Sequence, residues 1–270
     1  MFCNPKSGCA GLLIGCNIGF PIIVFRSQEY QDSRCHSQAQ QLPQCDPRNS
    51  FSGKRLRQLL QPFGIIPSDL SGVFVTHEHQ DHIIGLKVLR KCPHIQFYAN
   101  YRTANAIERK YELHGPWKIF NTGEAFYFDH DLSINTFPLP HDAIEPVGYT
   151  FKCDKYQCAW ATDFGHMTKT IADALSQSDE IVLESNHDEQ LLRNHPTRPA
   201  YLKERILGPL GHLSNRAAYD FLKNNRGIWQ KIYLAHLSKD CNSYELVHQL
   251  FQPLAQRNHF ELIIIDPRTI

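Results

Sequence analysis

Three features that this 270-residue chain lacks limit the classes of protein to which it can belong. No apolar run reaches the roughly 20 residues that span a bilayer, so no membrane partner is expected. The formal net charge is only +1, which argues neither for nor against binding to nucleic acid. No two of the nine cysteines form a Cys-x-x-Cys pair, and together with a His-rich cluster this favours reduced thiols and a cytoplasmic location over a disulfide framework.

The first 51 residues form an atypical segment. Residues 10–25 are apolar apart from Asn17, and the sequence LIGC at 13–16 resembles a lipoprotein cleavage box. The apolar stretch before Cys16 is too short for an export signal, so we favour a structural segment over an exported lipoprotein. Residues 27–50 are polar and lack periodicity, which predicts an irregular loop.

From residue 52 onwards, short apolar runs and amphipathic stretches follow one another. The runs predict strands at 73–75, 95–98, 124–128, 134–137, 147–151, 158–161, 180–184, 231–235 and 262–265. The amphipathic stretches predict helices at 54–63, 83–89, 101–113, 168–176, 187–194, 199–207 and 244–251, and one beginning after residue 214. Strands come first in runs and then alternate with helices, which predicts one layered α/β domain with mixed sheets over 52–270, with 1–51 as part of the same domain.

Potential metal ligands are concentrated where the first of these strands ends. The sequence THEHQDH at 76–82 supplies His77, His79, Asp81 and His82 within six residues. Imidazole and carboxylate suit zinc, manganese or iron, and a loop at a strand end can direct several of them into one cavity. The helical metalloprotease motif is excluded, because it needs a second His four residues after the first, where this chain has Asp81. The alternative is a His-rich surface loop.

Four further side chains of this kind follow predicted strands: His141, Asp163, Glu184 and His236. Each one alone would more often be a hydrogen-bonded structural residue, so the argument rests on their joint occurrence with the cluster. The seven candidate ligands are too many for one ion and suit a dinuclear site, and they are His77, His79, Asp81, His82, His141, Asp163 and His236. Two ions about 3.5–4 Å apart can share a hydroxide and a carboxylate, and they lower the pKa of bound water toward about 7.

The order His-x-His-x-Asp-His, His, Asp, His resembles the metallo-β-lactamase fold superfamily. The chain is more closely similar to the YycJ (WalJ) type, whose members are related to ribonuclease Z. Four stretches carry this closer resemblance: HDAIEPVGY at 141–149, LESNHD at 183–188, GHLSN at 211–215 and LAHLS at 234–238. The resemblance extends from about Ser52 to the C-terminus and identifies 52–270 as a metallo-β-lactamase-like hydrolase domain.

The resemblance implies a fold, a metal set and an activity. The fold is an αββα sandwich with mixed sheets, and the cofactors are two divalent ions, zinc or manganese. One ion is assigned to His77, His79 and His141, the other to Asp81, His82 and His236, and Asp163 bridges them. The implied activity is phosphodiester hydrolysis, by an exonuclease that acts on DNA or on RNA.

The same resemblance suggests a proton donor for the leaving oxygen. Glu184 is similar to the acid of the ribonuclease Z motif, and a hydrogen bond from His212 to it would raise the pKa of the imidazole. Asp81 is assigned a catalytic role besides its role as a ligand. Ser214 can cap the helix that follows, whose free N–H groups would favour a phosphate. Four residues are predicted to contact substrate or support the ligands, namely Asn186, His187, Ser214 and Asn215. The alternative is that His212 and Glu184 are structural.

Two further observations bear on the substrate. From Asp163 to His236 there are 73 residues (236 − 163), too few for a large cap domain in addition to the predicted elements, which implies an open groove. Residues 53–118 carry ten Lys or Arg against five acids, and this excess could follow a phosphate backbone or be an ordinary solvated helix face.

The first 50 residues depart from the pattern of the family. The expected Asp-x-Gly is missing, since Asp46-Pro47-Arg48 stands in its place. We hypothesise a frameshifted or rearranged start. If the segment is native as written, we expect the first strands to be missing and the activity to be impaired. Besides the nuclease, two alternatives remain: a small-molecule cyclic phosphodiesterase with the same site, and an inactive or binding-only protein.

Overall fold

The computed structural model describes residues 22–25, 56–58, 60–61, 65–129 and 132–268. These fall into two compact units, 1–121 and 122–270, and each is described by itself. The predicted limits of 1–51 and 52–270 stay a prediction, because nearly all of the first segment, including Asp46 and the cleavage-like box, lies outside the described residues. Within those residues, no helix is long and apolar enough to cross a membrane.

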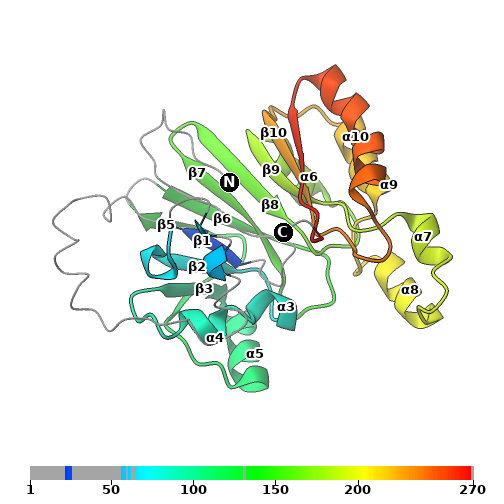
Figure 1. The fold of residues 1–270 in the computed structure, drawn as a ribbon. Coiled ribbons are helices and arrows are strands. Elements are labelled where there is room, and N and C mark those ends of the chain that lie inside the picture. The colour runs from blue at the N-terminus through cyan, green and yellow to red at the C-terminus, as the bar shows by residue number, and fades with distance from the viewer. Residues whose placement is uncertain (1–21, 26–55, 59, 62–64, 130–131, 269–270) are drawn as a thin grey trace. The chain divides into compact units, whose positions relative to one another are not determined.

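The first unit contains a four-stranded sheet in the order β1-β2-β3-β4 (Figure 1). Its strands are β1 (Ile22–Phe25), β2 (Gly72–Val75), β3 (Gln96–Asn100) and β4 (Trp117–Phe120). β1 pairs antiparallel with β2, and the other pairs are parallel. A strand does therefore precede the His cluster, so the expectation that the early strands are missing is wrong for β1. β4 was not predicted either; it has only four residues, and its burial does not alternate, because Lys118 and Ile119 at its centre are both exposed.

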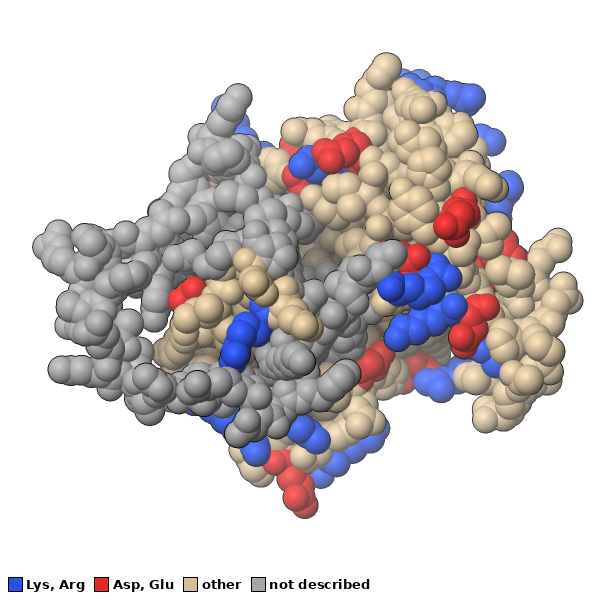
Figure 2. All heavy atoms as spheres, viewed as in Figure 1, with Lys and Arg blue, Asp and Glu red and all other residues tan. Residues whose placement is uncertain are grey.

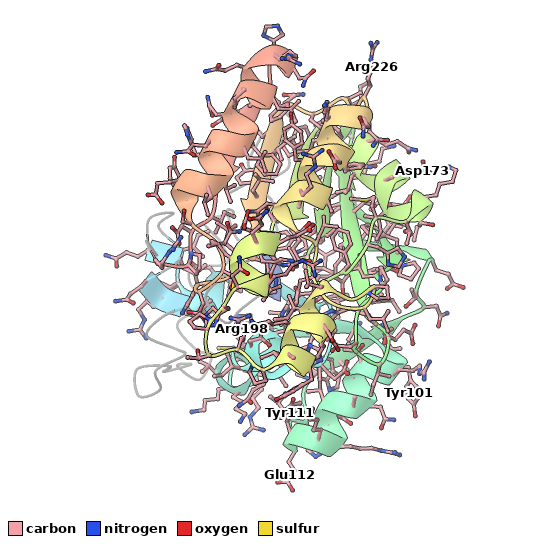
Figure 3. All side chains as sticks on the ribbon, turned by 90° about the vertical axis from the view of Figure 1, so that its right-hand side faces the viewer. Tyr101, Tyr111, Glu112, Asp173, Arg198 and Arg226 are labelled. Carbon is pink, nitrogen blue, oxygen red and sulfur yellow. The ribbon has the colours of Figure 1, made fainter. Side chains whose placement is uncertain are left out.

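Short helices connect the strands of this unit. They are η4 (Pro67–Asp69), α3 (Gln80–Ile83), α4 (Leu86–Leu89) and α5 (Tyr101–Tyr111), and residues 56–58 and 60 are also helical. Asn100 caps α5 by accepting a hydrogen bond from the amide of Thr103, and the helix ends at Glu112, which has a left-handed backbone (Figure 3). The buried side chains of Val73 and Val75 pack with Ile107, which anchors the strand that carries the His cluster.

The second unit contains a seven-stranded sheet in the order β11-β10-β9-β8-β7-β6-β5. The strands are β5 (Ala125–Asp129), β6 (Leu132–Pro138), β7 (Val147–Cys153), β8 (Tyr156–Ala161), β9 (Glu180–Glu184), β10 (Lys231–Ala235) and β11 (Glu261–Ile264). β5 to β8 are antiparallel, and β8 to β11 are parallel. In this register the carboxyl ends of β6, β8, β9 and β10 lie along one edge of the sheet.

Three helices cover one face of this sheet, namely α6 (Lys169–Ser176), α9 (Asn215–Asn224) and α10 (Tyr244–Asn258) (Figure 1). They bury Ile171, Phe221 and Phe251 against Ile181 and Leu183 of β9. Two shorter helices follow β9, α7 (Glu189–Arg193) and α8 (Ala200–Leu207). The predicted end of α10 at residue 251 is wrong: the helix continues past Pro253, because Leu254 and Ala255 on its next turn are buried in the core.

The cysteines differ in state. Cys158 and Cys241 are free and buried. Cys92 and Cys153 each take part in a disulfide bond, so the expectation of reduced thiols is wrong for these two side chains. The cytoplasmic location, which rested partly on that expectation, stays a prediction.

Candidate metal centre

The first unit gathers three imidazoles and one carboxylate in the loop after β2. His77 and His82 are buried and His79 is half-buried, whereas the side chain of Asp81 is 62% exposed. Nε2 of His77 lies 3.0 Å from Nδ1 of His79, so the two rings aim one nitrogen each at the same place. Two nitrogens bound to one tetrahedral zinc at about 2.0–2.1 Å lie roughly 3.4 Å apart. The pair therefore fits a shared metal ion with little movement.

Thr76 lies between two of these rings and was missed by the sequence analysis. Its Oγ1 is 3.1 Å from Nδ1 of His77 and 3.4 Å from Nδ1 of His82. A hydroxyl that accepts both Nδ1–H groups leaves the Nε2 atoms unprotonated, as a metal ligand must be. The signal available in the sequence was only its place directly before His77.

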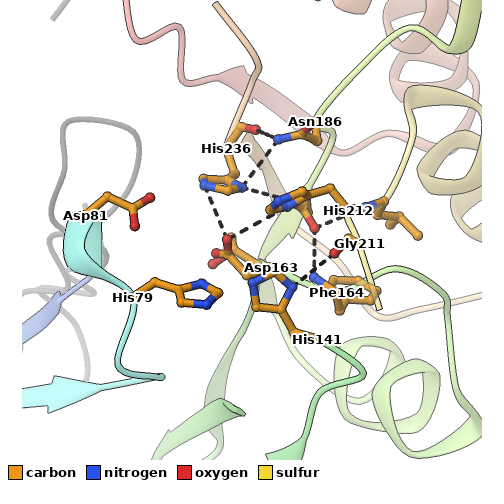
Figure 4. A network of polar contacts seen from close by, with 12 residues as sticks. His79, Asp81, His141, Asp163, Phe164, Asn186, Gly211, His212 and His236 are labelled. Carbon is orange, nitrogen blue, oxygen red and sulfur yellow. Dashed lines mark hydrogen bonds and ion pairs between the residues drawn. The ribbon is translucent and has the colours of Figure 1, made fainter. Parts of the chain in front are cut away.

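In the second unit, the four carboxyl ends along the sheet edge bring together His141, Asp163, Glu184 and His236, and the loop before α9 adds His212 (Figure 4). Oδ1 of Asp163 is 3.3 Å from Nε2 of His236. One potential ligand atom from each of Asp163, Glu184, His212 and His236 lies within 4.8 Å of the others. The ring centroids of His141 and His212 lie 5.1 Å apart, so the structure brings together the five residues predicted for this edge of the sheet.

Two of these residues have unusual backbones. Asp163 and His236, each just beyond its strand, have φ values of 67° and 59°, in the left-handed region that residues other than glycine rarely adopt. Such conformations cost of the order of 1–3 kcal/mol each, and they persist where the surrounding structure determines them. Both residues are predicted ligands, so part of the backbone strain of this unit lies at the functional edge of the sheet, although Asp154 between β7 and β8 and His259 after α10 also have left-handed backbones.

Glu184 is the centre of the network in this unit. Its Oε1 accepts hydrogen bonds from Nδ1 of His212 (2.9 Å) and of His236 (2.7 Å), and its Oε2 accepts the amides of Phe164 (3.0 Å) and Leu213 (3.1 Å). Burial alone would raise the pKa of this carboxyl, but the two imidazoles outweigh burial and hold the pKa below its usual range. In turn, Glu184 overcomes the effect of burial on His212 and raises the pKa of that imidazole. The expected contact between Glu184 and His212 is present, and the contact with His236 was not foreseen.

The histidines of this unit have the orientation of metal ligands. A metal-binding His commonly donates its second ring N–H to a carboxylate or a backbone carbonyl, which fixes the tautomer. His141 does so to the carbonyl of Gly211 at 3.1 Å, and His236 does so to Glu184. Nε2 is then the ligand atom in both. Burial lowers the pKa of His141, which favours the neutral form that binds metal.

Asn186 and His187, predicted to support the site or contact substrate, are buried behind it. The amide of Asn186 donates to the carbonyl of His236 at 2.7 Å, which holds the strained residue in place. Asn242, which the sequence analysis missed, donates to the carbonyls of Ser185 and Asn186. No motif marks Asn242, because it supports backbone rather than chemistry.

Ser214 and Asn215 are also buried at the start of α9. Ser214 caps the helix as predicted, since its Oγ accepts the amide of Ala217, and the same hydroxyl donates to Glu189 at 2.8 Å. The amide of Asn215 donates to the carbonyl of His187. Two of the first three amides are therefore occupied and an acid lies beside them, and the binding of a phosphate at this helix start stays a prediction.

Comparison with known proteins gives the family. Residues 44–230 match the profile of a family described as "Beta-lactamase superfamily domain". The chain belongs to the metallo-β-lactamase superfamily. It is 36% identical over 212 residues to the "Exodeoxyribonuclease WalJ" of Streptococcus pneumoniae serotype 2 (strain D39 / NCTC 7466), covering 76% of this chain and 78% of that protein. It is 34% identical over 216 residues to the "Exodeoxyribonuclease YycJ" of Bacillus anthracis, covering 78% and 80%.

The fold comparison agrees with this assignment. The crystal structure of the metallo-β-lactamase fold protein YhfI from Bacillus subtilis is similar to this structure, with a TM-score of 0.60 and 15% sequence identity. The match covers 94% of this chain and 95% of YhfI. These findings confirm the predicted family and fold class, and they confirm that the chain is a hydrolase of the nuclease type. The fold, with the His and Asp groups of both units, also makes the chain a binder of divalent metal.

Proposed function

We propose that this chain is an exodeoxyribonuclease that uses two divalent ions, zinc or manganese. His77, His79 and His141 would hold one ion and Asp81, His82 and His236 the other, with Asp163 shared between them. The observation that carries the proposal is the orientation of the imidazoles. In His77, His141 and His236, a protein group engages Nδ1 and leaves Nε2 as the ligand atom.

The ions would lower the pKa of water and stabilise charge on the phosphate. The side chains of the chain would supply the proton transfers. His212, whose Nδ1 is engaged by Glu184, would donate the Nε2 proton to the departing oxygen. Glu184 keeps that imidazole protonated and oriented, and Asp81, which is exposed, would accept the proton that water gives up.

The two relatives named exodeoxyribonucleases support DNA as the substrate. The surface of the first unit is compatible with a polyanion, because seven of its basic side chains are exposed: Lys87, Arg90, Lys91, Arg102, Arg109, Lys110 and Lys118. Acidic side chains lie among the basic ones over the face drawn in Figure 2, so this surface favours loose contact with a backbone over a single strong binding site.

The test combines metal analysis with a panel of substrates. Purified protein should contain two ions per chain and shorten end-labelled DNA from its ends. The panel compares duplex DNA, single-stranded DNA, RNA and a small cyclic phosphodiester. Turnover of the cyclic diester with none on DNA would identify a small-molecule phosphodiesterase instead. A metal-loaded protein that hydrolyses none of the four would overturn the proposal in favour of the binding-only alternative.

Variants test the assignment of ligands. Replacing His141 or His236 by alanine should each empty mainly one metal position, because each contributes to a different ion in the proposed set. His166→Ala is the matched control, since this exposed His of the second unit binds the carbonyl of Pro209, belongs to none of the candidate ligand groups among the described residues, and should leave metal content unchanged. Two ions retained in both site variants would show that the ligand set is wrong.

A further inference from the structure

We propose that the exposed side of α8, through Tyr201 and Arg205, is a subsite that holds single-stranded DNA beside the reacting phosphate. The inference rests on the proposed function and extends it from the chemistry to how the strand is held. It concerns residues that no sequence motif marked, in the segment between β9 and α9.

The segment that follows α8 is fastened to the candidate metal centre by backbone contacts. The carbonyl of Gly211 binds His141, the carbonyl of Leu210 accepts the amide of Asp142, and the amide of His212 donates to the carbonyl of Ile206 in α8 itself. A Cβ at Gly211 would lie 2.2 Å from that carbonyl oxygen of Ile206, so only glycine permits this approach. The end of α8 is thus held directly next to His141 and His212.

Arg205 extends this connection toward solvent. Its Nε binds Oδ2 of Asp142, the residue that follows His141, while 57% of the Arg205 side chain is exposed. Among the described residues, no hydrogen bond from its terminal Nη groups is recorded. A guanidinium held at Nε presents the two Nη groups as a fixed fork, which matches the geometry of a phosphate.

Tyr201 lies one helical turn, roughly 6 Å, before Arg205 and on the same side of α8. It is 72% exposed, so it adds little to the stability of the fold. An exposed aromatic ring next to a cation is the combination that holds single strands, with the base stacked on the ring and the phosphate on the cation. The spacing suits one nucleotide next to the reacting bond.

The charge around α8 agrees with a polyanionic strand. Residues 193–205 carry four basic side chains and one acid, Glu204. Arg198, in the loop before α8, binds Asp240 and faces the viewer in Figure 3. Asp240 and Asp142 pair with Arg198 and Arg205 and offset two of these charges, so an excess of one positive charge remains around α8.

The experiment measures kcat/KM on a 12-nucleotide single strand and on methyl p-nitrophenyl phosphate, a small diester whose one aryl group is the leaving group and which carries no base to stack on Tyr201. Stacking of one base on an aromatic ring is worth about 5- to 150-fold in affinity. Tyr201→Ala should therefore lower kcat/KM for the single strand about tenfold more than for the small ester. Tyr201→Phe should retain the parent values. Arg205→Met should lower the salt dependence of single-strand binding by about one counterion.

Tyr127→Ala is the matched control, because Tyr127 is 74% exposed in the same unit but lies on β5, the far edge strand of the sheet. It should behave as the parent protein on both substrates. Equal losses on both substrates for Tyr201→Ala, or the same loss in the control, would overturn the subsite alone. If the parent protein hydrolyses the small ester but neither binds nor cleaves DNA, the proposed function falls and the subsite with it.

Discussion

Replacing Glu184 by glutamine changes one atom, yet the contacts of this side chain predict a large effect. All four of its recorded partners are donors: two imidazole N–H groups on Oε1 and two backbone amides on Oε2. Glutamine has one oxygen and one NH₂ group. In either orientation, the NH₂ group faces two donors in a fully buried position.

The magnitude follows from the orientation that glutamine adopts. If NH₂ faces Phe164 and Leu213, two buried amides lose their acceptor at about 1–3 kcal/mol each, which lowers the free energy of unfolding by roughly 2–6 kcal/mol. If NH₂ faces His212 and His236 instead, both rings must present a bare Nδ1 and move their proton to Nε2. His236 then loses its ligand atom and His212 its stable donor state, so metal content and turnover fall together.

The assay compares urea unfolding, metal content and hydrolysis for Glu184→Gln and for Glu180→Gln. Glu180 is a buried acid at the other end of β9, where it accepts from the hydroxyl of Tyr233. Glu180 also forms a hydrogen bond with Tyr156, and a tyrosine hydroxyl can donate to the oxygen of glutamine or accept from its NH₂ group, so the control should keep its metal and its turnover. A Glu184→Gln protein with parental stability, full metal content and parental turnover would refute the four-donor account.

Three other outcomes are expected. His212→Ala should keep its metal but lose roughly 10²–10⁴ in turnover on DNA, and a p-nitrophenyl ester should recover most of that loss; equal losses on both esters would exclude His212 as the acid. Asp163→Asn should reduce metal content and turnover together, since an amide oxygen is a poor bridge, and full occupancy would remove Asp163 from the site. Burial lowers the pKa of His187 to about 4, from the ordinary value of about 6.5 that holds in the unfolded chain. Between pH 4 and about 6.5 the unfolded chain binds more protons than the folded chain, so the free energy of unfolding should decrease by up to about 3 kcal/mol as the pH falls through this range. Urea titrations in which His187→Gln is equally acid-sensitive would contradict this.

The strongly patterned parts of the fold were predictable from the sequence. β9 was predicted at its observed limits, 180–184. All five residues are buried, and an unbroken run of three apolar residues lies between the two acids. α6 and α8 were predicted to within one residue at each end. In both, the stretch with apolar residues at helical spacing stops at the residues that flank the helix. β1 was missed because it lies at the end of the continuous apolar stretch 10–25, from which no strand was singled out. β4 was missed although three of its four residues are apolar, because so short a run gives a weak signal.

The candidate site was predictable as a set of side chains but not as a network. His141, Asp163, Glu184 and His236 were found because each one follows a strand. The double role of Glu184 was not, because it depends on β9 lying between β8 and β10 and on the loop before α9 turning back over it. Thr76 and Asn242 were missed for the same reason, since hydroxyl and amide side chains have many possible partners and only the fold selects one.

At Asp163 and His236 the left-handed backbone lowers the stability of the fold, whereas the side chain is required for the chemistry. Glycine adopts φ near 60° without strain, so glycine at either position would relax the turn. The same change would remove a side chain that the site needs, and at position 236 it would also remove the hydrogen bond to the buried Glu184. Relief of backbone strain at these two turns is therefore tied to loss of the site's chemistry, which is not so at Asp154 and His259, where the backbone is also left-handed.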